Sequence, residues 1–335
     1  MNGLAFFLRK PMRERFNFVG KNLNPQEEAS AAYSIASKRK ERNVFYAEEL
    51  EKTSGEVKAI ELADSLLKGE FLDLEIAEVP ELRPERFHIM SDEWFKKNIV
   101  QSTIAFYASF EDKAAFSRER AGSSLDLYTT ILHEGIHAVS HQKHWVDVEK
   151  RKVSEYRVGY GVTNTATPEK KDVHLNAFNE GVTEMTVQEL FQSNQKRIKR
   201  ELSISEEAIA GIKFSYAHFR AVVTEIVYGV AKHKAEEAKE VWKRIKRGQF
   251  TGDMMHLRDI EYAYGKGALR VLNALRMIPG EMVKDSKDDA SITGRNDKIL
   301  QYFESYDRGE ERKEEVRQEL AKEILGEEAY KRYCL

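Results

Sequence analysis

The stretch that decides the fold reads Tyr128-Thr129-Thr130-Ile131-Leu132-His133-Glu134-Gly135-Ile136-His137-Ala138-Val139-Ser140-His141. We interpret it as a helix, because Leu132, Ile136 and Val139 recur at helical spacing and no proline interrupts the run. The four-residue interval between His133 and His137 then places both imidazoles on one face, about 6 Å apart along the axis. Two ring nitrogens at this spacing can reach one Zn²⁺ ion at about 2.0–2.1 Å.

Glu134 completes the arrangement H-E-x-x-H, which is typical of zinc-dependent peptidases. Its side chain projects about 100° away from His133, too far round the helix to bind the same ion but able to touch a water on it. The competing interpretation is a solvated helix face that carries two histidines. A third ligand elsewhere in the chain would favour the metal site.

Two candidates for the third ligand follow the motif closely, and both fail. His141 lies two turns beyond His133, about 12 Å along the axis, so a continuous helix cannot bring it to the same ion. The pair His137 and His141 also lacks a following glutamate, because Ala138 occupies that place. The metzincin arrangement needs a histidine where Lys143 stands.

A better candidate lies in a second predicted helix, which reads Leu175-Asn176-Ala177-Phe178-Asn179-Glu180-Gly181-Val182-Thr183-Glu184-Met185-Thr186-Val187-Gln188-Glu189-Leu190. Val182, Met185 and Leu190 form its apolar stripe, and Asn179 is expected to cap its start. The same segment carries two glutamates four residues apart.

Glu180 and Glu184 therefore share one face, where two like charges repel unless a cation neutralises them. Glu180 could bind zinc directly, while Glu184 could accept a hydrogen bond from the outer nitrogen of a ligating histidine. The competing interpretation is an ordinary acidic helix face. Together with the first motif, the pair favours a metal site.

The two motifs together, His133-Glu134-x-x-His137 and Asn179-Glu180-x-x-x-Glu184, resemble those of the gluzincins, the thermolysin-like zinc metallopeptidases, including the compact minigluzincins. The resemblance implies one Zn²⁺ per chain, a peptide or unfolded protein as substrate, and a small sheet whose edge strand binds that substrate. It assigns the residues as follows: zinc ligands His133, His137 and Glu180, general base Glu134, and supporting residues Glu184 and Asn179.

The motifs cover two helices, and the likeness extends more loosely over about residues 84–275. The interval between His137 and Glu180 is longer than in thermolysin. That interval includes a predicted strand, 156–162, which places Tyr156 and Tyr160 on one face. These tyrosines either pack in the core or stabilise an oxyanion. Further candidates for the oxyanion role are His174, His218, Tyr262 and Tyr264.

The rest of the chain predicts an α+β fold that is mostly helical, in three parts. An N-terminal helical segment covers 1–80: Asn24 and Glu27 form a capping box for a helix to about Leu50, and a helix over 55–68 ends at Gly69. Leu72, Leu74 and Ile76 alternate with polar residues as on a strand.

A zincin-like peptidase domain is expected over 81–280. Its predicted strands cover 86–91, 99–110 and 114–117, before the first motif helix. Helices are expected over 205–247 and 257–277, the latter closed by Pro279-Gly280. A charged helical tail, 281–335, has few apolar anchors: Tyr302, Phe303, Leu320 and Ile324. Either flanking part could cover the cleft, complete the core or bind a partner.

Composition narrows the class of protein. The 335 residues are 41% hydrophobic and 33% charged, with a net charge of −2, so neither disorder nor nucleic-acid binding is expected. The single cysteine, Cys334, permits no intramolecular disulfide. No signal peptide and no membrane span are predicted, so a cytoplasmic location is the expectation.

The predicted function is a zinc-dependent endopeptidase in which Glu134 accepts a proton from the metal-activated water. The alternative is a catalytically silent zinc-binding scaffold or interaction protein. Glu134 favours the enzyme, because a structural zinc site has no use for a base beside an open coordination position. The sequence does not define the oligomeric state or the cleavage specificity.

Overall fold

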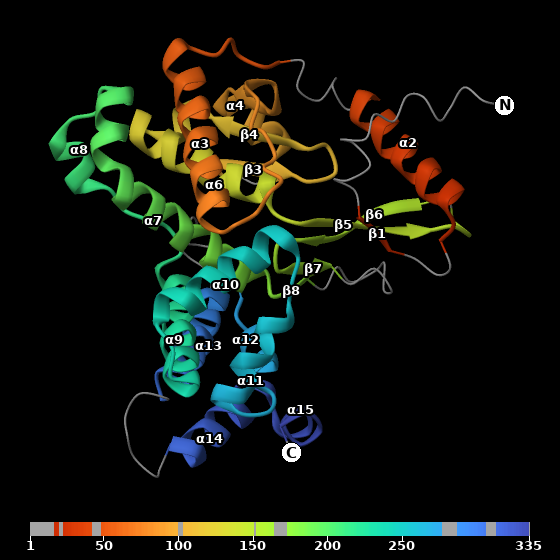
Figure 1. Cartoon of the computed structure of the whole chain (residues 1–335), viewed down its shortest axis with the longest axis vertical. Coiled ribbons are helices and arrows are strands. Elements are labelled where there is room, and N and C mark those ends of the chain that lie inside the picture. Colours follow the sequence, from red (N-terminus) through yellow and green to blue (C-terminus); the bar gives the residue numbers. More distant parts are fainter. Residues whose placement is uncertain are drawn as a thin grey trace. The chain divides into compact units, whose positions relative to one another are not determined.

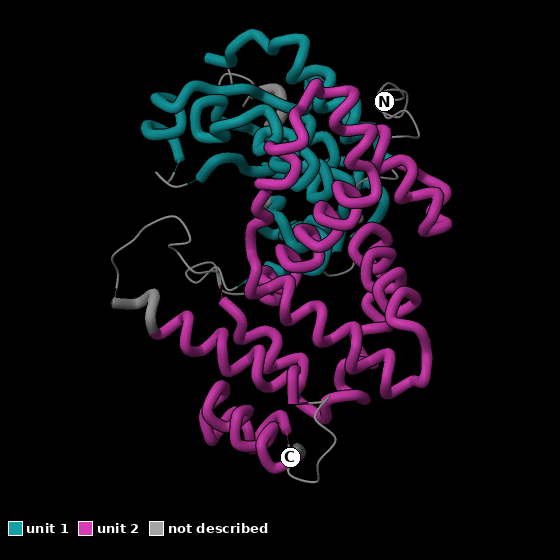
Figure 2. The backbone as a smooth tube through the Cα atoms, turned by 90° about the vertical axis from the view of Figure 1, so that its left-hand side faces the viewer, with its two compact units in different colours: residues 1–64, 80–173 teal, residues 65–79, 174–335 magenta. Residues whose placement is uncertain are grey.

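The computed structural model describes residues 17–19, 23–41, 48–99, 103–150, 152–163, 173–276, 287–305 and 313–334. The described chain is mostly helical and contains two small sheets (Figure 1), which confirms the coarse α+β prediction. It divides into two compact units (Figure 2): residues 1–64 with 80–173, and residues 65–79 with 174–335. The predicted division into 1–80, 81–280 and 281–335 stays a prediction.

Unit 1 begins with strand β1 (Asn17–Val19) and helix α2 (Pro25–Glu41). The predicted capping box is present: Asn24 Oδ1 accepts the backbone N–H groups of Gln26 and Glu27 at 3.0 Å, and Asn24 N donates to Glu27 Oε2 at 2.8 Å. The helix does not reach Leu50 as predicted, because residues 48–50 are not helical.

Helix α3 (Ser54–Asp73) starts at its own capping box, in which Thr53 N donates to Glu56 Oε2 at 2.7 Å. The helix runs through Gly69, where we predicted its end, and includes Leu72, which is 72% exposed. The predicted strand over Leu72 to Ile76 is therefore wrong. An isolated glycine weakens a helix without ending it, and here the apolar face continues to the buried Phe71.

A three-stranded sheet precedes the first motif helix, as predicted. It follows η2 (Pro84–Arg86) and consists of β2 (Phe87–Met90), β3 (Ala105–Ala108) and β4 (Lys113–Ser117) in the order β2-β4-β3. Strand β4 runs parallel to β2 and antiparallel to β3. The predicted strand over 99–110 is confirmed only for Ala105–Ala108, and residues 100–102 lie outside the described part. Helix α4 (Asp92–Asn98) connects β2 to this region.

Helices α5 (Arg118–Ala121) and α6 (Ser124–Val139) follow, and α6 packs on β3 and β4. The chain then forms β5 (Gln142–Asp147), β6 (Lys152–Val158), β7 (Gly161–Thr163) and β8 (Val173–His174). The sheet order is β1-β5-β6-β7-β8. The predicted strand over 156–162 is thus the end of β6, a turn at Gly159 and Tyr160, and the start of β7.

Unit 2 is helical. It contains α7 (Asn176–Leu202), α8 (Glu206–Gly211), α9 (Ala217–Lys234), α10 (Ala238–Thr251), η3 (Met255–Leu257), α11 (Arg258–Tyr264) and α12 (Ala268–Asn273). The predicted helix over 257–277 is broken between α11 and α12. Gly265 and Gly267 there have φ of 94° and 92°, which a helix cannot contain. Pro279 and Gly280 lie outside the described residues.

The C-terminal segment contributes α13 (Lys287–Glu304), α14 (Lys313–Leu325) and α15 (Glu327–Tyr333), and α13 packs on α9. The predicted anchors Tyr302, Phe303 and Ile324 are all buried. Tyr302 also donates a hydrogen bond to the carbonyl of Tyr264 at 3.1 Å. These helices therefore complete the core of unit 2.

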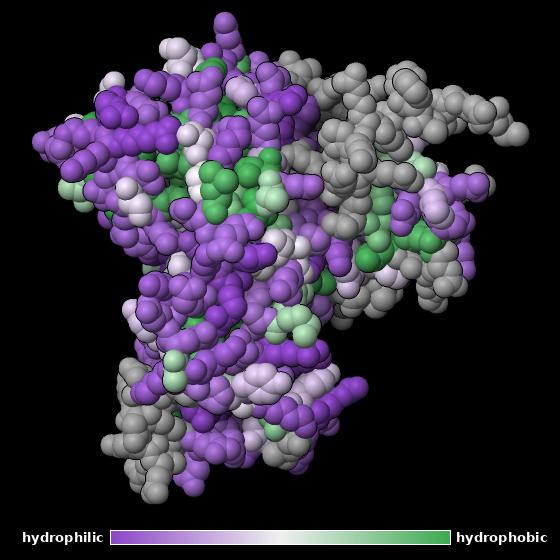
Figure 3. Space-filling model, in the orientation of Figure 1, coloured by the Kyte–Doolittle hydropathy of each residue, from purple (hydrophilic) through white to green (hydrophobic). Residues whose placement is uncertain are grey.

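The molecular surface in Figure 3 is dominated by hydrophilic residues, as the charge content predicts. Among the described residues, none of the helices has the length and apolar character needed to span a bilayer.

Candidate metal centre

Helix α6 is fixed at both ends by local hydrogen bonds. Ser123 Oγ accepts the backbone N–H of Asp126 at 3.0 Å at the start, and Ser140 N donates to the carbonyl of Ile136 at 2.9 Å at the end. Arg86 adds a hydrogen bond to the carbonyl of Ala138 at 3.2 Å. Residues 131–139 are buried on all sides, so this part of the helix is a core element.

The two histidines of the first motif lie side by side on α6, as predicted. Their Nε2 atoms are 3.2 Å apart, and the ring centroids are 4.9 Å apart with an interplanar angle of 72°. Nitrogen ligands about 2.0–2.1 Å from a tetrahedral zinc would be about 3.3–3.4 Å apart. The observed pair of Nε2 atoms therefore fits two corners of such a site, and His133 and His137 are both buried.

Glu134 is also buried, with 8% of its surface exposed. It occupies the helical position next to His133, so it faces a different direction from the two imidazoles. Helix α6 ends at Val139, before His141. The helix is therefore broken where coordination of the same metal ion by His141 would require a break. Burial and the positive charges of Arg157 and Lys143 lower the pKa of His141 to about 4.

Helix α7 carries Glu180 one turn after its start. The start is anchored by Leu175, whose backbone has a left-handed φ of 56° and whose N–H donates to Asn273 Oδ1 at 2.8 Å. At the next position, a Cβ on Gly181 would lie 2.8 Å from the carbonyl oxygen of Phe219. Helix α9 therefore approaches α7 closely because residue 181 has no side chain.

Asn179 does not cap α7, contrary to the prediction, because the helix begins three residues earlier. It is buried within the helix, where its Oδ1 lies 3.5 Å from Gln249 Nε2. The same Gln249 nitrogen donates to Thr183 Oγ1 at 2.7 Å. A buried polar cluster thus joins α7 to α10 beside the position of Glu180.

The structure brings His133, His137 and Glu180 together. One potential ligand atom from each of the three residues lies within 4.8 Å of the others, and Glu180 is half-buried. His141 is not a member of this group. The donor set, two imidazole nitrogens and one carboxylate oxygen, is one that binds Zn²⁺ and leaves a fourth position open.

Glu184 is buried one turn beyond Glu180. Its Oε1 accepts the backbone N–H of Ser215, in the segment before α9, at 2.7 Å. The carboxylate therefore orders this segment. Its predicted hydrogen bond to a ligating histidine stays a prediction.

The predicted oxyanion candidates belong to several elements of both units, and several have other partners. The ring of Tyr156 lies 6.2 Å from that of Trp145, and Tyr160 is fully buried in the turn after β6. Tyr264 donates its hydroxyl to the carbonyl of Glu225 at 2.6 Å. His174 Nδ1 lies 3.0 Å from Asn273 Nδ2, and His218 Nε2 lies 2.7 Å from Asp297 Oδ1. The side chain of Tyr262 is 67% exposed.

Sequence reasoning did not single out a pocket that lies further along α7. Arg220 of α9 and Gln188 of α7 are among the residues that line it. No motif marks them, because their proximity depends on how α7 and α9 pack.

Comparisons of the chain with family models, with curated protein sequences and with solved structures find no match.

Proposed function

We propose that the protein is a zinc-dependent endopeptidase with a zincin-like core. The observation that carries the proposal is the group of three potential ligands, His133, His137 and Glu180, with Glu134 directly after the first of them. Two histidines and a glutamate form the protein ligands of several hydrolytic zinc sites. The three-stranded sheet, α6 and α7 would form the zincin-like core.

The residues fit a zinc ion on chemical grounds. The 3.2 Å separation of the two Nε2 atoms is close to the edge of a tetrahedron around zinc. The single carboxylate keeps the site from collecting the oxygen ligands that Ca²⁺ or Mg²⁺ would need. Bound there, zinc would lower the pKa of a coordinated water and polarise a substrate carbonyl.

The chain itself would supply the proton transfers. Glu134 would accept a proton on its carboxylate and then deliver it to the departing amine. Its burial supports this role, because a site that excludes bulk water limits the loss of protons to solvent. Glu184 would help to hold the site, through its bond to Ser215 and through the predicted histidine contact.

Metal analysis of the purified chain, with matched variants, tests the metal site. We expect about one zinc per chain in the wild type, and loss of zinc in His133→Ala and in Glu180→Ala. The exposed residues His233 and Glu207 provide controls, so His233→Ala and Glu207→Ala should keep the metal. Full zinc occupancy in both ligand variants would refute the assignment.

Hydrolysis of a quenched fluorescent peptide library tests the enzyme. Glu134→Gln should keep zinc and lose hydrolysis, because glutamine has the size of glutamate but accepts no proton at neutral pH. An active Glu134→Gln variant would remove the general-base role. A wild-type chain that holds zinc and cleaves no peptide would instead favour the silent scaffold.

A further inference from the structure

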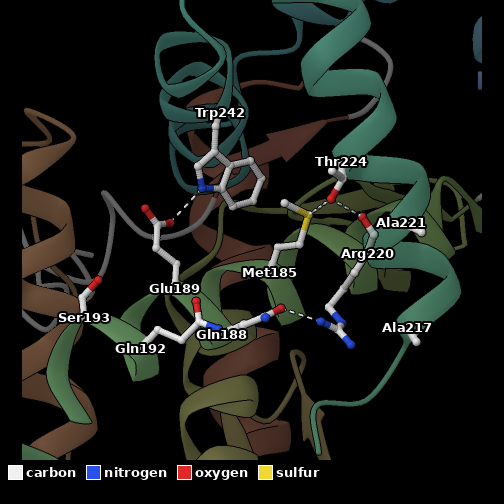
Figure 4. Close-up of a pocket in the computed structure, with 10 residues that line it drawn as sticks. All are labelled: Met185, Gln188, Glu189, Gln192, Ser193, Ala217, Arg220, Ala221, Thr224 and Trp242. Atoms are coloured by element: carbon white, nitrogen blue, oxygen red, sulfur yellow. Dashed lines mark hydrogen bonds between the residues drawn. The ribbon is translucent and has the colours of Figure 1, made fainter. Parts of the chain in front are cut away.

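A pocket of about 530 Å³ lies on unit 2, between α7 and α9, with α10 at one side (Figure 4). Its volume is in the range of small-molecule and peptide subsites. The alanines Ala217 and Ala221 of α9 leave the space open opposite Gln188 of α7. Arg220 of α9 and Glu189 of α7 also line the pocket. The net charge that a ligand meets there depends on which of these two side chains is neutralised by a neighbouring residue.

Arg220 is held by neutral acceptors. Its Nε donates to the carbonyl of Ser215 at 3.0 Å, Nη2 lies 3.4 Å from the carbonyl of Phe214, and Nη1 donates to Gln188 Oε1. In contrast, Arg197 and Arg244 pair with the carboxylates of Glu201 and Glu236. Among the described residues, no carboxylate pairs with Arg220, so the guanidinium is positioned but its charge is not neutralised.

The acidic side chain of the pocket is already compensated. Glu189 Oε2 accepts hydrogen bonds from Trp242 Nε1 at 2.7 Å and from Lys246 Nζ at 2.8 Å (Figure 4 shows the first). Lys246 is buried and also pairs with the buried Glu70, at 2.6 Å, and burial raises the pKa of that carboxyl, so the ammonium charge is shared with a group that is itself disposed to be neutral. The charge that remains available to a ligand within the pocket is therefore that of Arg220.

The position of Arg220 is unfavourable for the isolated helix. It is the fourth residue of α9, near the positive end of the helix dipole, and the first turn of α9 contains no acidic residue. A cation there costs about 0.3–1 kcal/mol relative to a neutral residue. A residue that costs stability yet is oriented by three hydrogen bonds is a candidate for binding an anion.

Helix α7 carries both the partner of the Arg220 guanidinium, Gln188, and the candidate metal ligand Glu180. Gln188, which binds Arg220, lies two turns beyond Glu180, about 12 Å along the axis. Glu184 lies between them, and Ser215 joins it to Arg220: the backbone N–H of Ser215 donates to Glu184, and its carbonyl accepts from Arg220. A distance of about 12 Å corresponds to three or four residues of extended peptide.

We propose that the pocket binds the C-terminal carboxylate of a short peptide, which Arg220 pairs with through its guanidinium. An extended peptide anchored at Arg220, beside Gln188, and lying along α7 would place a bond about three or four residues from its C-terminus near Glu180, because Gln188 and Glu180 are about 12 Å apart along the helix axis. Built on the proposed peptidase function, this assignment makes peptides with a free C-terminus the preferred substrates, cleaved about three or four residues from that end.

A binding experiment tests the proposal without turnover. The full-length Glu134→Gln protein is titrated in a calorimeter with a neutral peptide of about seven residues, as the free acid and as the C-terminal amide. We expect the free acid to bind at least about tenfold more tightly, because a charge-assisted pair is lost in the amide. Trp242 lines the pocket, so the free acid should also change a fluorescence signal that Trp242→Phe removes.

Variants at Arg220 locate the effect. Adding Arg220→Gln should abolish the difference between acid and amide, whereas Arg220→Lys should keep part of it, because lysine retains the charge but not the planar fork. Arg200→Gln, which removes the same charge from a side chain that is 75% exposed on α7, should leave the difference intact. Circular dichroism and zinc content of each variant establish that it is folded.

Equal affinity for acid and amide would overturn the proposal. Tight binding of an amidated peptide with one internal glutamate, equal to that of the free acid, would also overturn the proposal. The pocket would then bind a side-chain carboxylate and not the C-terminal one. Discrimination between acid and amide in a wild-type protein that cleaves nothing would support the binding site and refute only the peptidase function.

Discussion

A single methyl group at position 229 should disrupt the helical core of unit 2. A Cβ on Gly229 of α9 would lie 1.9 Å from the hydroxyl oxygen of Tyr264 and 2.5 Å from its Cζ, so Tyr264 of α11 must move in Gly229→Ala. That hydroxyl donates to the carbonyl of Glu225 at 2.6 Å, and the Tyr264 ring packs against Phe303 of α13 with centroids 4.9 Å apart.

Three contributions set the magnitude of the effect. Overpacking a buried site costs about 1–3 kcal/mol. Loss of the hydrogen bond from Tyr264 costs about 0.5–1.5 kcal/mol. Alanine gains about 0.5–1 kcal/mol over glycine in a helix. The free energy of unfolding should therefore fall by about 2 kcal/mol.

Urea unfolding followed by circular dichroism measures this difference, provided that the slope with denaturant is unchanged. Gly294→Ala on α13 and Gly69→Ala on α3 are matched controls, because an added Cβ meets no atom within 4 Å at either position. Both controls should stabilise by about 0.5–1 kcal/mol. If Gly229→Ala is as stable as these controls, the close packing of α9 on Tyr264 is refuted.

Three further outcomes are expected. Glu184→Ala should weaken zinc binding about 10–100-fold and Glu184→Gln less, as measured by competition with a chelator. Unchanged affinity in both variants would show that Glu184 does not support the metal ligands and serves only as the acceptor for Ser215. Because the folded state lowers the pKa of His141 to about 4, the unfolded chain binds the proton first, and stability should fall by about 1–2 kcal/mol between pH 6.5 and 4. His141→Gln should flatten that part of the urea-derived stability profile, and an unaltered profile would exclude His141 as its source. A chain shortened to end at Arg276 should lose cooperative thermal unfolding, because the fully buried Ile299 and Phe303 are removed; a folded, more active product would instead identify the tail as a lid.

The parts of the candidate site that the sequence predicted are those set by spacing within one helix. A four-residue interval places His133 beside His137 in any α-helix, and the structure has their Nε2 atoms 3.2 Å apart. The same holds for the capping box at Asn24 and Glu27, which is a local hydrogen-bond pattern. Such features need no knowledge of the tertiary structure.

The sequence-based predictions were wrong where tertiary packing determines the local structure. Gly69 resembles a helix end, but the buried Phe71 keeps α3 helical to Asp73. Gly265 and Gly267 interrupt an otherwise helical pattern, and the sequence does not tell a tolerated glycine from one with positive φ. Arg220 was not recognised because its meaning depends on the neutral partners that α7 and the preceding segment bring to it.

The discontinuity of unit 2 has a consequence for biosynthesis. Residues 65–79 belong to this unit, and the Phe71 ring lies 4.6 Å from that of Phe250, while Glu70 pairs with Lys246 at 2.6 Å. A ribosome adds about 5–20 residues per second, so Phe71 emerges roughly 10–35 s before its partner exists. During that interval Phe71 and Glu70 lack these two native partners on α10. This end of α3 therefore reaches its native packing only after α10 has been made.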